Sequence, residues 1–388
     1  MIHTLAIANY RSLRDIVMPL GRMTVVTGAN GSGKSNLYKA LRLLAESASG
    51  RIINAMAEDG GLESSIWAGP ERISRAMRRG AVPVQGGPRQ DVVRLKMGFA
   101  ADEFGYCASL GLPPPAASSK FQLDPEIKRE CIWAGPFYRP ASCLVDRSGP
   151  LVKVRQGRQW DVRFQNLNTF ESMLAEIADP VAVPEIFAVR QFIRRWRFYD
   201  NFRTDRESRI RVPQIGTRSP VLDHEGHNLA AALQTILEIG DSQALHDAVD
   251  DAFPGSRLGV QVDSGSRFVL ALQQPGLLRP LTQAELSDGT LRYLCLIAAL
   301  LTPRPPALLV FNEPETSLHP DLLPALARLF MKVAQETQVW VISHSARLVA
   351  ALRETDMCQY IALEKDLGET SITGQGLLDK PAWHWPDE

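Results

Sequence analysis

The sequence predicts an α/β fold with a mixed or parallel central sheet and a compact α+β insertion lobe. Residues 24–30 are rich in β-branched residues, which indicates a short buried strand running into a glycine-rich turn. The segment 35–47 follows with apolar residues at helical spacing. Two further apolar runs, 307–311 and 339–343, have the length and composition of buried parallel strands, and 289–301 has that of a largely buried helix.

The turn after the first strand reads GANGSGKS at 28–35 and fits the pattern G-x-x-x-x-G-K-[ST]. Glycines let consecutive backbone N–H groups converge on phosphate oxygens, and the helix N-terminus adds partial positive charge. Lys34 is expected to contact the β- and γ-phosphates and Ser35 to bind Mg²⁺. An incidental glycine-rich turn is the alternative. The residues expected at the phosphates are Asn30, Gly31, Ser32, Gly33, Lys34, Ser35 and Asn36.

Polar residues follow both later strands, in LLVFNEPETSLHP (308–320) and VISHS (341–345). The carboxyl ends of parallel strands form the edge at which open α/β sheets bind ligands. Glu313 is predicted to polarise an attacking water, since phosphoryl transfer depends mainly on positioning and charge. His344 is predicted to reach the same edge and donate to the γ-phosphate; a capping or buried histidine is the alternative.

The segment LSDGT at 286–290 resembles the LSGGQ signature of ABC-type ATPases, one helix before the acidic strand. The opening IHTLAIANYRSL at 2–13 resembles the first strand and N-F-R-S turn of RecF/SMC-type proteins. The chain therefore resembles a RecF-like AAA-type ATPase, strongly over about 1–47 and 281–350.

The resemblance implies a P-loop NTPase fold of the ABC-type ATPase head, with ATP and Mg²⁺ as cofactors. It implies that Arg11 contacts the nucleotide, with a surface arginine as the alternative. It also implies that Ser287 and Gly289 contact ATP held by a second copy, so that ATP induces a homodimer. Without that contact, 289–301 would be an ordinary core helix capped by Ser287.

One residue departs from the family pattern. Most relatives end the acidic strand in Asp-Glu, whereas this chain has Asn312-Glu313. The aspartate orients Mg²⁺ or its waters, and Asn312 keeps an acceptor oxygen but loses the charge. Weaker Mg²⁺ affinity and slow turnover are therefore expected, and an ATP-binding switch without hydrolysis is the alternative.

Composition indicates a cytoplasmic protein. Among 388 residues, Lys+Arg and Asp+Glu are both 43, so net charge gives no indication of nucleic-acid binding. Five cysteines without a C-x-x-C pair favour a reducing compartment. The longest apolar stretch is far short of the roughly 20 residues that a membrane span needs, so no membrane association is expected.

The middle of the chain, about 50–280, carries frequent prolines and glycines, which disfavour the long coiled coil of SMC proteins. We therefore expect one composite head, residues 1–388. Its parts are an N-terminal part with the phosphate loop (1–105), an insertion lobe (106–280) and a C-terminal part (281–388). Strands are expected at 92–101 and 267–274 and a helix at 227–240, while no nuclease domain is expected.

Within the insertion, residues 190–211 hold eight arginines interleaved with aromatic residues. Two interpretations stay open. Arginines and aromatic faces suit phosphates and unstacked bases, or the aromatic residues belong to the core and the arginines face solvent. The first predicts salt-sensitive DNA binding.

The resemblance implies a role in DNA repair, including double-strand break repair, or in recombination. The alternative is a regulatory or antiphage-defence ATPase that gates a separately encoded effector protein, with little or no hydrolysis. A transporter motor subunit fits less well, because those heads lack the N-Y-R-S opening.

Overall fold

The computed structural model describes residues 1–86, 92–114, 120–376 and 378–386. The chain divides into two units. The first contains Met1–Gly21, Val26–Trp196 and Ile361–Glu388, and the second contains Arg22–Val25 and Arg197–Tyr360. These units follow contacts in space, so the motif-based division at 105 and 280 stays a prediction.

The first unit is built on an eight-stranded sheet in which every neighbouring pair is antiparallel. In spatial order its strands are β2 (Leu13–Pro19), β1 (Ile2–Tyr10), β4 (Leu95–Ala101), β5 (Phe104–Gly111), β6 (Glu126–Ala134), β7 (Cys143–Ser148), β8 (Leu151–Gln156) and β9 (Gln159–Phe164). The strand predicted at 92–101 is thus confirmed over Leu95–Ala101.

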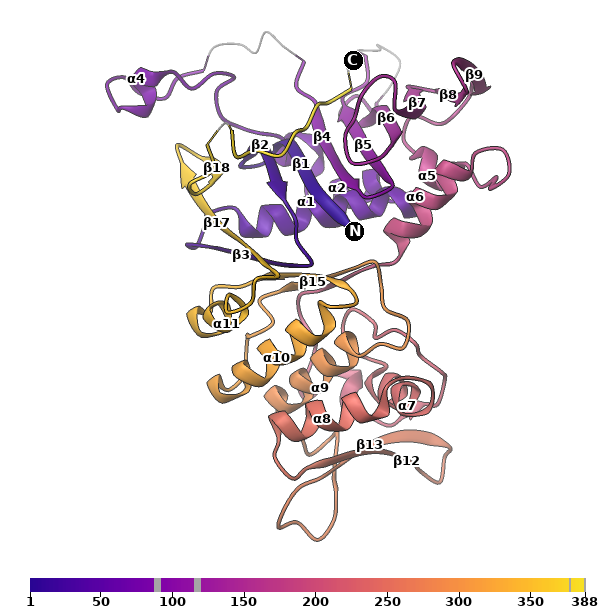
Figure 1. Cartoon of the computed structure of the whole chain (residues 1–388), viewed down its shortest axis with the longest axis vertical. Helices are drawn as coiled ribbons and strands as arrows, with labels where there is room; N and C mark the ends of the chain where they lie inside the picture. The colour runs from indigo at the N-terminus through magenta and orange to yellow at the C-terminus, as the bar shows by residue number, and fades with distance from the viewer. Residues whose placement is uncertain (87–91, 115–119, 377, 387–388) are drawn as a thin grey trace. The chain divides into compact units, whose positions relative to one another are not determined.

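Helices cover the first sheet beside the phosphate loop. Helix α1 (Lys34–Glu46) contacts β1 and β4, and Figure 1 shows it crossing these strands. Its buried residues recur at helical spacing, which confirms the helix predicted at 35–47. The smaller helices of this unit are α2 (Ile52–Glu58), α3 (Gly61–Ser65), α4 (Arg75–Arg78), α5 (Met173–Glu176) and α6 (Pro184–Arg194).

The sheet ends at β9, whose residues are almost all exposed on both faces. Trp160 and Val162 alternate there with the charged residues Asp161 and Arg163, which form an ion pair with a 3.1 Å separation. Strand β9 pairs with β8 along one of its two sides. Among the described residues, no strand pairs with the backbone groups on the other side of β9.

In the second unit, strands β10 (Trp196–Tyr199), β15 (Leu308–Asn312) and β16 (Gln338–Ile342) are successive neighbours in a sheet. β15 and β16 run parallel, as the apolar runs predicted, and their carboxyl ends lie in register at Asn312 and Ile342. The first residues of β3 (Met23–Gly28) belong to this unit, and Val339 N donates to Arg22 O at 2.8 Å.

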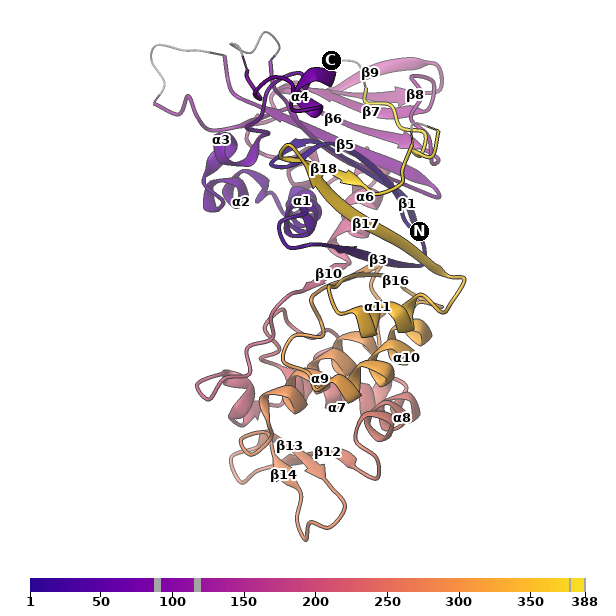
Figure 2. The same ribbon diagram turned by 90° about the vertical axis from the view of Figure 1, so that its left-hand side faces the viewer.

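Helices form most of the second unit's core, as Figure 2 shows. They are α7 (Leu229–Ile239), α8 (Ser242–Ala252), α9 (Asp288–Leu300), α10 (Leu323–Val333) and α11 (Ala346–Leu352). The helices predicted at 227–240 and 289–301 are confirmed as α7 and α9. Antiparallel strands β12 (Arg257–Val262) and β13 (Arg267–Gln273) follow α8, with β11 (Gln214–Ile215) and β14 (Leu281–Thr282) at β13. Strand β13 confirms the strand predicted at 267–274.

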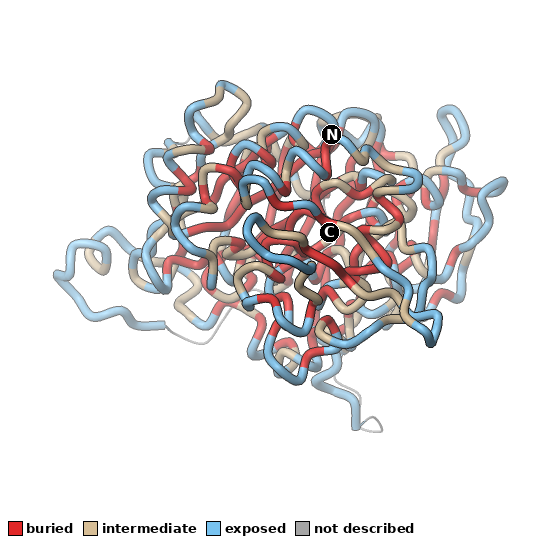
Figure 3. Tube along the Cα trace, turned by 90° about the horizontal axis from the view of Figure 1, so that it is seen from below, coloured by how far each residue is buried: buried red, intermediate tan, exposed pale blue. Residues whose placement is uncertain are grey.

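After the second unit, the chain returns to the first through β17 (Cys358–Asp366), which forms an antiparallel hairpin with β18 (Glu369–Ile372). Figure 3 shows buried segments in the interior, with exposed loops around them. None of the helices among the described residues is both long enough and apolar enough to cross a membrane.

The aromatic side chains of the segment 190–211 pack inside the protein, with Phe192 half-buried and the other four buried. Phe192 and Trp196 pack against Phe99, with ring centroids 5.9 and 5.2 Å apart. The remaining aromatic residues of the segment are buried as well: Phe198, Tyr199 and Phe202. The interpretation in which these rings stack on bases is therefore wrong. Arg194 and Arg195 are exposed, as the alternative interpretation expected.

Candidate nucleotide-binding site

The glycine-rich turn between β3 and α1 has a conformation that needs its glycines. Gly31 and Gly33 have φ values of 78° and 108°, in the left-handed region. A Cβ on Gly33 would lie 2.2 Å from Thr370 Oγ1, and one on Gly28 would lie 2.5 Å from the Leu363 carbonyl oxygen. A side chain at either position would therefore displace the turn from its support.

Lys34 is buried at the first turn of α1, and its ammonium group lies inside the turn. Its Nζ donates to the carbonyl oxygens of Gly28 at 2.6 Å and Ala29 at 3.0 Å. Asn30, Gly31 and Ser35 are exposed beside it. The turn thus places one fixed positive charge at a helix N-terminus, the arrangement that binds anions.

Two hydroxyl groups support the glycine-rich turn through hydrogen bonds. Thr370 Oγ1 donates to the Ser32 carbonyl at 2.9 Å and lies 2.7 Å from Ser12 Oγ. Asn36 Nδ2 donates to the same Ser12 hydroxyl at 2.8 Å. Sequence reasoning missed Ser12 and Thr370; Thr370 lies 338 positions after Ser32, so no local pattern links the two.

Arg11 lies after β1 with a φ of 48°, and its guanidinium pairs with an acid. Its Nη2 is 3.2 Å from Asp59 Oδ2, while Lys39 Nζ is 2.9 Å from Asp59 Oδ1. Tyr10 also donates to Asp59 at 3.5 Å, and burial raises the pKa of Tyr10 to about 12. Arg11 is therefore not a free surface arginine, and its contact with nucleotide stays a prediction.

In the second unit, the end of β15 brings Glu313 and His344 together. Glu313 has a φ of 51°, and its N–H donates to the Ile342 carbonyl at 2.8 Å. This bond aligns the residues after β15 with those after β16. His344 Nδ1 lies 3.3 Å from Glu313 Oε1, and both side chains are partly exposed. Asn312 is the last residue of β15.

Glu315 fixes the loop that carries His344. Its Oε1 accepts hydrogen bonds from Ser343 Oγ at 2.6 Å and from the backbone N–H groups of His344 and Ser345, both at 3.1 Å. Three donors on one carboxylate oxygen hold this loop against the residues that follow β15. Sequence reasoning gave Glu315 no role, although an acid two residues after Glu313 was a signal.

Ser287 caps helix α9, with its Oγ accepting from the Thr290 N–H at 3.1 Å. The same Oγ lies 2.8 Å from Thr290 Oγ1, and either hydroxyl can be the donor in that contact. Gly289 is packed closely, since a Cβ there would lie 2.9 Å from the Ser317 carbonyl. Ser287, Gly289, Ser317 and His319 line an open pocket of about 600 Å³.

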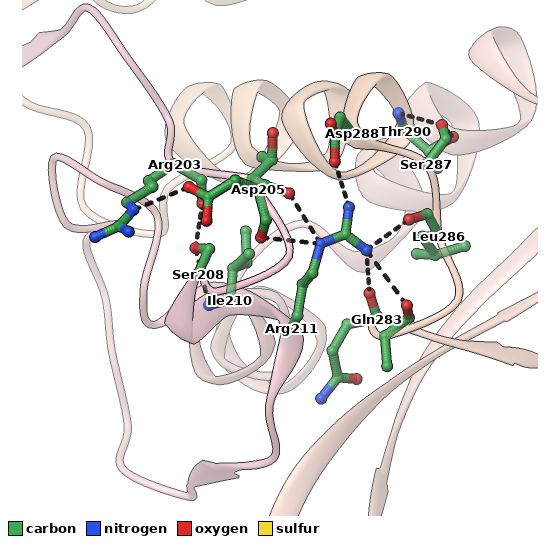
Figure 4. A network of polar contacts seen from close by, with 12 residues as sticks. Arg203, Asp205, Ser208, Ile210, Arg211, Gln283, Leu286, Ser287, Asp288 and Thr290 are labelled. Atoms are coloured by element: carbon green, nitrogen blue, oxygen red, sulfur yellow. Dashed lines mark hydrogen bonds and ion pairs between the residues drawn. The ribbon is translucent and has the colours of Figure 1, made fainter.

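Arg211 fixes the segment that leads into α9, as Figure 4 shows. Its Nη1 donates to the Leu286 carbonyl at 2.8 Å, and its Nη2 pairs with the Asp288 carboxylate. Its Nε donates to the Thr204 carbonyl at 2.9 Å, which ties the segment to a distant loop. Asp288 occupies the position of a glycine in LSGGQ. The Arg211 charge offsets this acid, which would otherwise repel a phosphate.

A buried arginine ties α9 to the loop after β15. Arg292 Nη1 donates to the Thr316 carbonyl at 3.1 Å, and Nη2 donates to Asn201 Oδ1 at 2.6 Å. Burial lowers the pKa of Arg292. The start of α9 and the loop after Glu313 therefore form one connected surface within the second unit.

If Ser287 and Gly289 contact ATP held by a second copy, as the LSDGT resemblance implies, replacing Arg211 by Ala should weaken ATP-dependent association of two copies while leaving ATP binding by one copy unchanged. The change removes charge-assisted hydrogen bonds worth about 1.5–3 kcal/mol, which corresponds to about a 10- to 100-fold weaker dimer. Light scattering with a non-hydrolysable ATP analogue measures association, and calorimetry measures binding.

Arg209→Ala is the matched control, because Arg209 is exposed on the same turn. Association as strong in Arg211→Ala as in Arg209→Ala would contradict the role of Arg211.

The phosphate loop, the acidic strand end and the capped helix define a P-loop ATPase of the ABC type, and the comparisons with known proteins agree. The family model for "AAA domain, putative AbiEii toxin, Type IV TA system" matches residues 116–350, and one for "AAA ATPase domain" matches residues 1–75. The chain belongs to the first family, whose model covers more than half of it. No curated protein matches the chain.

Solved structures of Smc heads have a similar fold. A structure of the SmcHead bound to the C-winged helix domain of ScpA is similar with a TM-score of 0.51 at 14% identity, over 97% of this chain and 98% of that one. The Smc head domain with an extended coiled coil, bound to the C-terminal domain of ScpA derived from Pyrococcus furiosus, gives 0.50 at 14% identity, over 96% and 95%. At this identity the likeness shows the fold alone, and it confirms the predicted fold class.

Among the described residues, no group of three or more His, Cys, Asp and Glu side chains could hold a metal ion. A magnesium ion at this kind of site takes few protein ligands and several phosphate and water oxygens. The exposed hydroxyl of Ser35 and the amide oxygen of Asn312 are suitable oxygen donors. Each of these two residues therefore offers the kind of ligand that magnesium takes when it arrives with a nucleotide.

Proposed function

We propose that the protein binds Mg-ATP, hydrolyses it slowly and associates with a second copy across the bound nucleotide. The observation that carries the proposal is the glycine turn, which Thr370 holds in place and which encloses the Lys34 ammonium group. Lys34 and the N–H groups of residues 30–36 would hold the triphosphate. Ser35 and Asn312 would each give one oxygen to magnesium, and Arg11 would contact the nucleotide if its pairing with Asp59 opens.

Glu313 would orient the attacking water, and His344 would contact the γ-phosphate. The 3.3 Å approach of His344 Nδ1 to Glu313 supports this pairing of roles, because each side chain limits the other's orientation. Asn312 lacks the charge of aspartate, which supports slow turnover. If the rate of hydrolysis at this site were zero, the protein would be an ATP-binding switch.

The signature segment would complete the site of a second copy. Ser287 and Gly289 line an open pocket, and the Ser287 hydroxyl would turn from Thr290 Oγ1 to donate to a phosphate oxygen. Each site would then take its phosphate loop from one copy and its signature from the other. ATP would thus act as the link that holds a homodimer.

A RecF-like role in DNA repair, including double-strand break repair, in the cytoplasm is the biological setting that we favour. Exposed arginines on the segment 190–211 support contact with a phosphate backbone. DNA would then be a partner through its phosphates rather than through stacked bases. All five cysteines are free thiols, which suits a reducing compartment.

The experiment that tests this setting is ATP turnover without DNA, with single-stranded DNA and with duplex DNA. We expect DNA to stimulate turnover, and the triple replacement of Arg194, Arg195 and Arg197 by Ala to weaken DNA binding and its salt dependence. Arg304→Ala, at an exposed arginine in another loop, is the control. Unchanged DNA binding in the triple variant would exclude this segment as the contact surface.

A second candidate function is a regulatory or antiphage-defence ATPase that gates a separately encoded effector protein. The family model that matches residues 116–350 is described as a putative AbiEii toxin, which favours this candidate. The Smc heads of similar fold are bound to domains of ScpA, which shows that such a fold can hold a partner protein. Turnover that is insensitive to DNA but changes when an effector protein is added would favour it over repair.

A further inference from the structure

Asp59 lies at the carboxyl end of α2 and contacts two cations from other parts of the first unit. Arg11 Nη2 is 3.2 Å from Asp59 Oδ2, and Lys39 Nζ donates to Asp59 Oδ1 at 2.9 Å. The Tyr10 hydroxyl donates to Asp59 Oδ2 at 3.5 Å. Two cations therefore share one acid, and this group of side chains carries a net positive charge.

The group lies beside the start of α1, next to the residues expected at the phosphates. Lys39 is one helical turn after Ser35, because positions four apart share a face of a helix. Asn36, one residue after Ser35, donates to the hydroxyl of Ser12, which follows Arg11 in the chain. One helical turn rises about 5.4 Å, so these contacts hold Arg11 close to the phosphate loop.

The guanidinium of Arg11 is only partly satisfied by its surroundings. A guanidinium carries five N–H donors. Arg11 Nε is buried, and no described residue gives it a hydrogen-bond partner. The backbone is anchored, since the Arg11 N–H donates to the Ser65 carbonyl at 2.8 Å and φ is 48°. Arg11 is thus fixed by its backbone, while its side chain keeps donors that an anion can use.

The contacts of Asp59 can open without loss of the core. Its side chain is 33% exposed, so water can replace its partners. Gly60 and Gly61 follow it with φ values of 96° and 80°, and a Cβ on Gly61 would have no heavy atom within 4 Å. Glycines adopt many backbone conformations, so this turn can move the carboxylate away from Arg11.

We propose that Asp59 is a positioning residue that holds Arg11 away from ATP, so that a phosphate group must displace its carboxylate. This inference rests on the proposed binding of ATP at the phosphate loop. A carboxylate and a phosphate both bind a guanidinium through charge-assisted N–H···O bonds, so the two anions compete for Arg11. Tyr10 strengthens the closed pairing, because it stands at the position of the phenylalanine in N-F-R-S and adds a hydroxyl. The pairing therefore lowers the affinity of the free protein for ATP.

Calorimetry with the full-length protein, Mg²⁺ and a non-hydrolysable ATP analogue tests this inference. Asp59→Asn keeps the shape of the side chain and removes its charge. We expect this variant to bind the analogue about 5-fold more tightly than the wild type. Glu58→Gln, at the exposed neighbouring residue of α2, removes an equal charge and should bind like the wild type.

A double-mutant cycle distinguishes positioning of Arg11 from a purely structural role of Asp59. Asp59→Asn should change nothing in an Arg11→Ala background, because the competition is for Arg11. Loss of structure alone would weaken binding, so it does not produce the expected gain. Weaker or unchanged binding in Asp59→Asn would overturn the inference, and so would an equal gain in the Arg11→Ala background.

Tyr10→Phe provides a second test that holds even if Asp59→Asn does not fold. It keeps the buried ring, removes the hydroxyl that donates to Asp59, and should tighten binding by about 2-fold. Unchanged binding in this variant would speak against the closed pairing.

The wild type separates this inference from the proposed function. Binding by the wild type with the same affinity in Asp59→Asn overturns the inference alone, whereas no binding by either protein overturns both.

Discussion

Glu313→Gln should abolish ATP turnover and leave ATP binding intact. Gln keeps the size of the side chain and an acceptor oxygen but loses the charge that polarises the attacking water. Loss of a positioned general base costs about 10²–10⁴-fold in rate. Phosphate release measures turnover, and calorimetry measures binding.

The same variant should accumulate as an ATP-bound dimer, because the nucleotide that joins two copies is no longer cleaved. Light scattering with and without ATP detects this species. Glu336→Gln, at an exposed residue after α10, is the matched control and should behave like the wild type. Wild-type hydrolysis in Glu313→Gln would show that another group activates the water.

Arg147→Ala should destabilise the protein more than any surface substitution proposed above. Arg147 on β7 and Glu130 on β6 form an ion pair with a 2.7 Å separation and side chains that are 0% exposed. Glu130 also accepts hydrogen bonds from Tyr106 at 2.6 Å and Ser172 at 2.5 Å, but these neutral donors do not compensate its charge once Arg147 is removed. Removal of one partner of a buried pair costs about 3–5 kcal/mol, because the other charge remains buried.

Urea unfolding, followed by circular dichroism, measures the change in the free energy of unfolding. The control is Arg163→Ala, which removes an exposed ion pair with Asp161 and should cost no more than about 1 kcal/mol. Similar losses in the two variants would mean that the buried pair does not stabilise the first unit more than a surface pair does.

The sequence predicted the elements that carry the motifs because their signals are local. The strand, glycine turn and helix around Lys34 follow one another within a few residues, and β15 and β16 are short apolar runs of a length that only a buried strand fits. The parallel register of β15 and β16 then brings the residues after them to one edge, where Glu313 and His344 meet.

The supports of the site could not be predicted, since they join residues that are distant in the sequence. Arg211 lies 77 positions before Asp288, and Thr370 lies 338 positions after Ser32. The segment 190–211 holds eight arginines, and nothing in the sequence distinguishes Arg211 as the one that contacts the signature segment. The aromatic residues of that segment were ambiguous for a related reason, because buried and base-stacking rings have the same composition.

Strand β9, at the end of the first sheet, affects how molecules associate in concentrated solution. Trp160 and Val162 on β9 favour extended pairing, and one side of this strand has no partner strand in the part of the chain that the structure describes, so its backbone offers donors and acceptors to another extended chain. Asp161 and Arg163 interrupt that apolar pattern with charges that are costly to bury between two molecules. The two charged residues thereby oppose edge-to-edge pairing of this sheet between molecules.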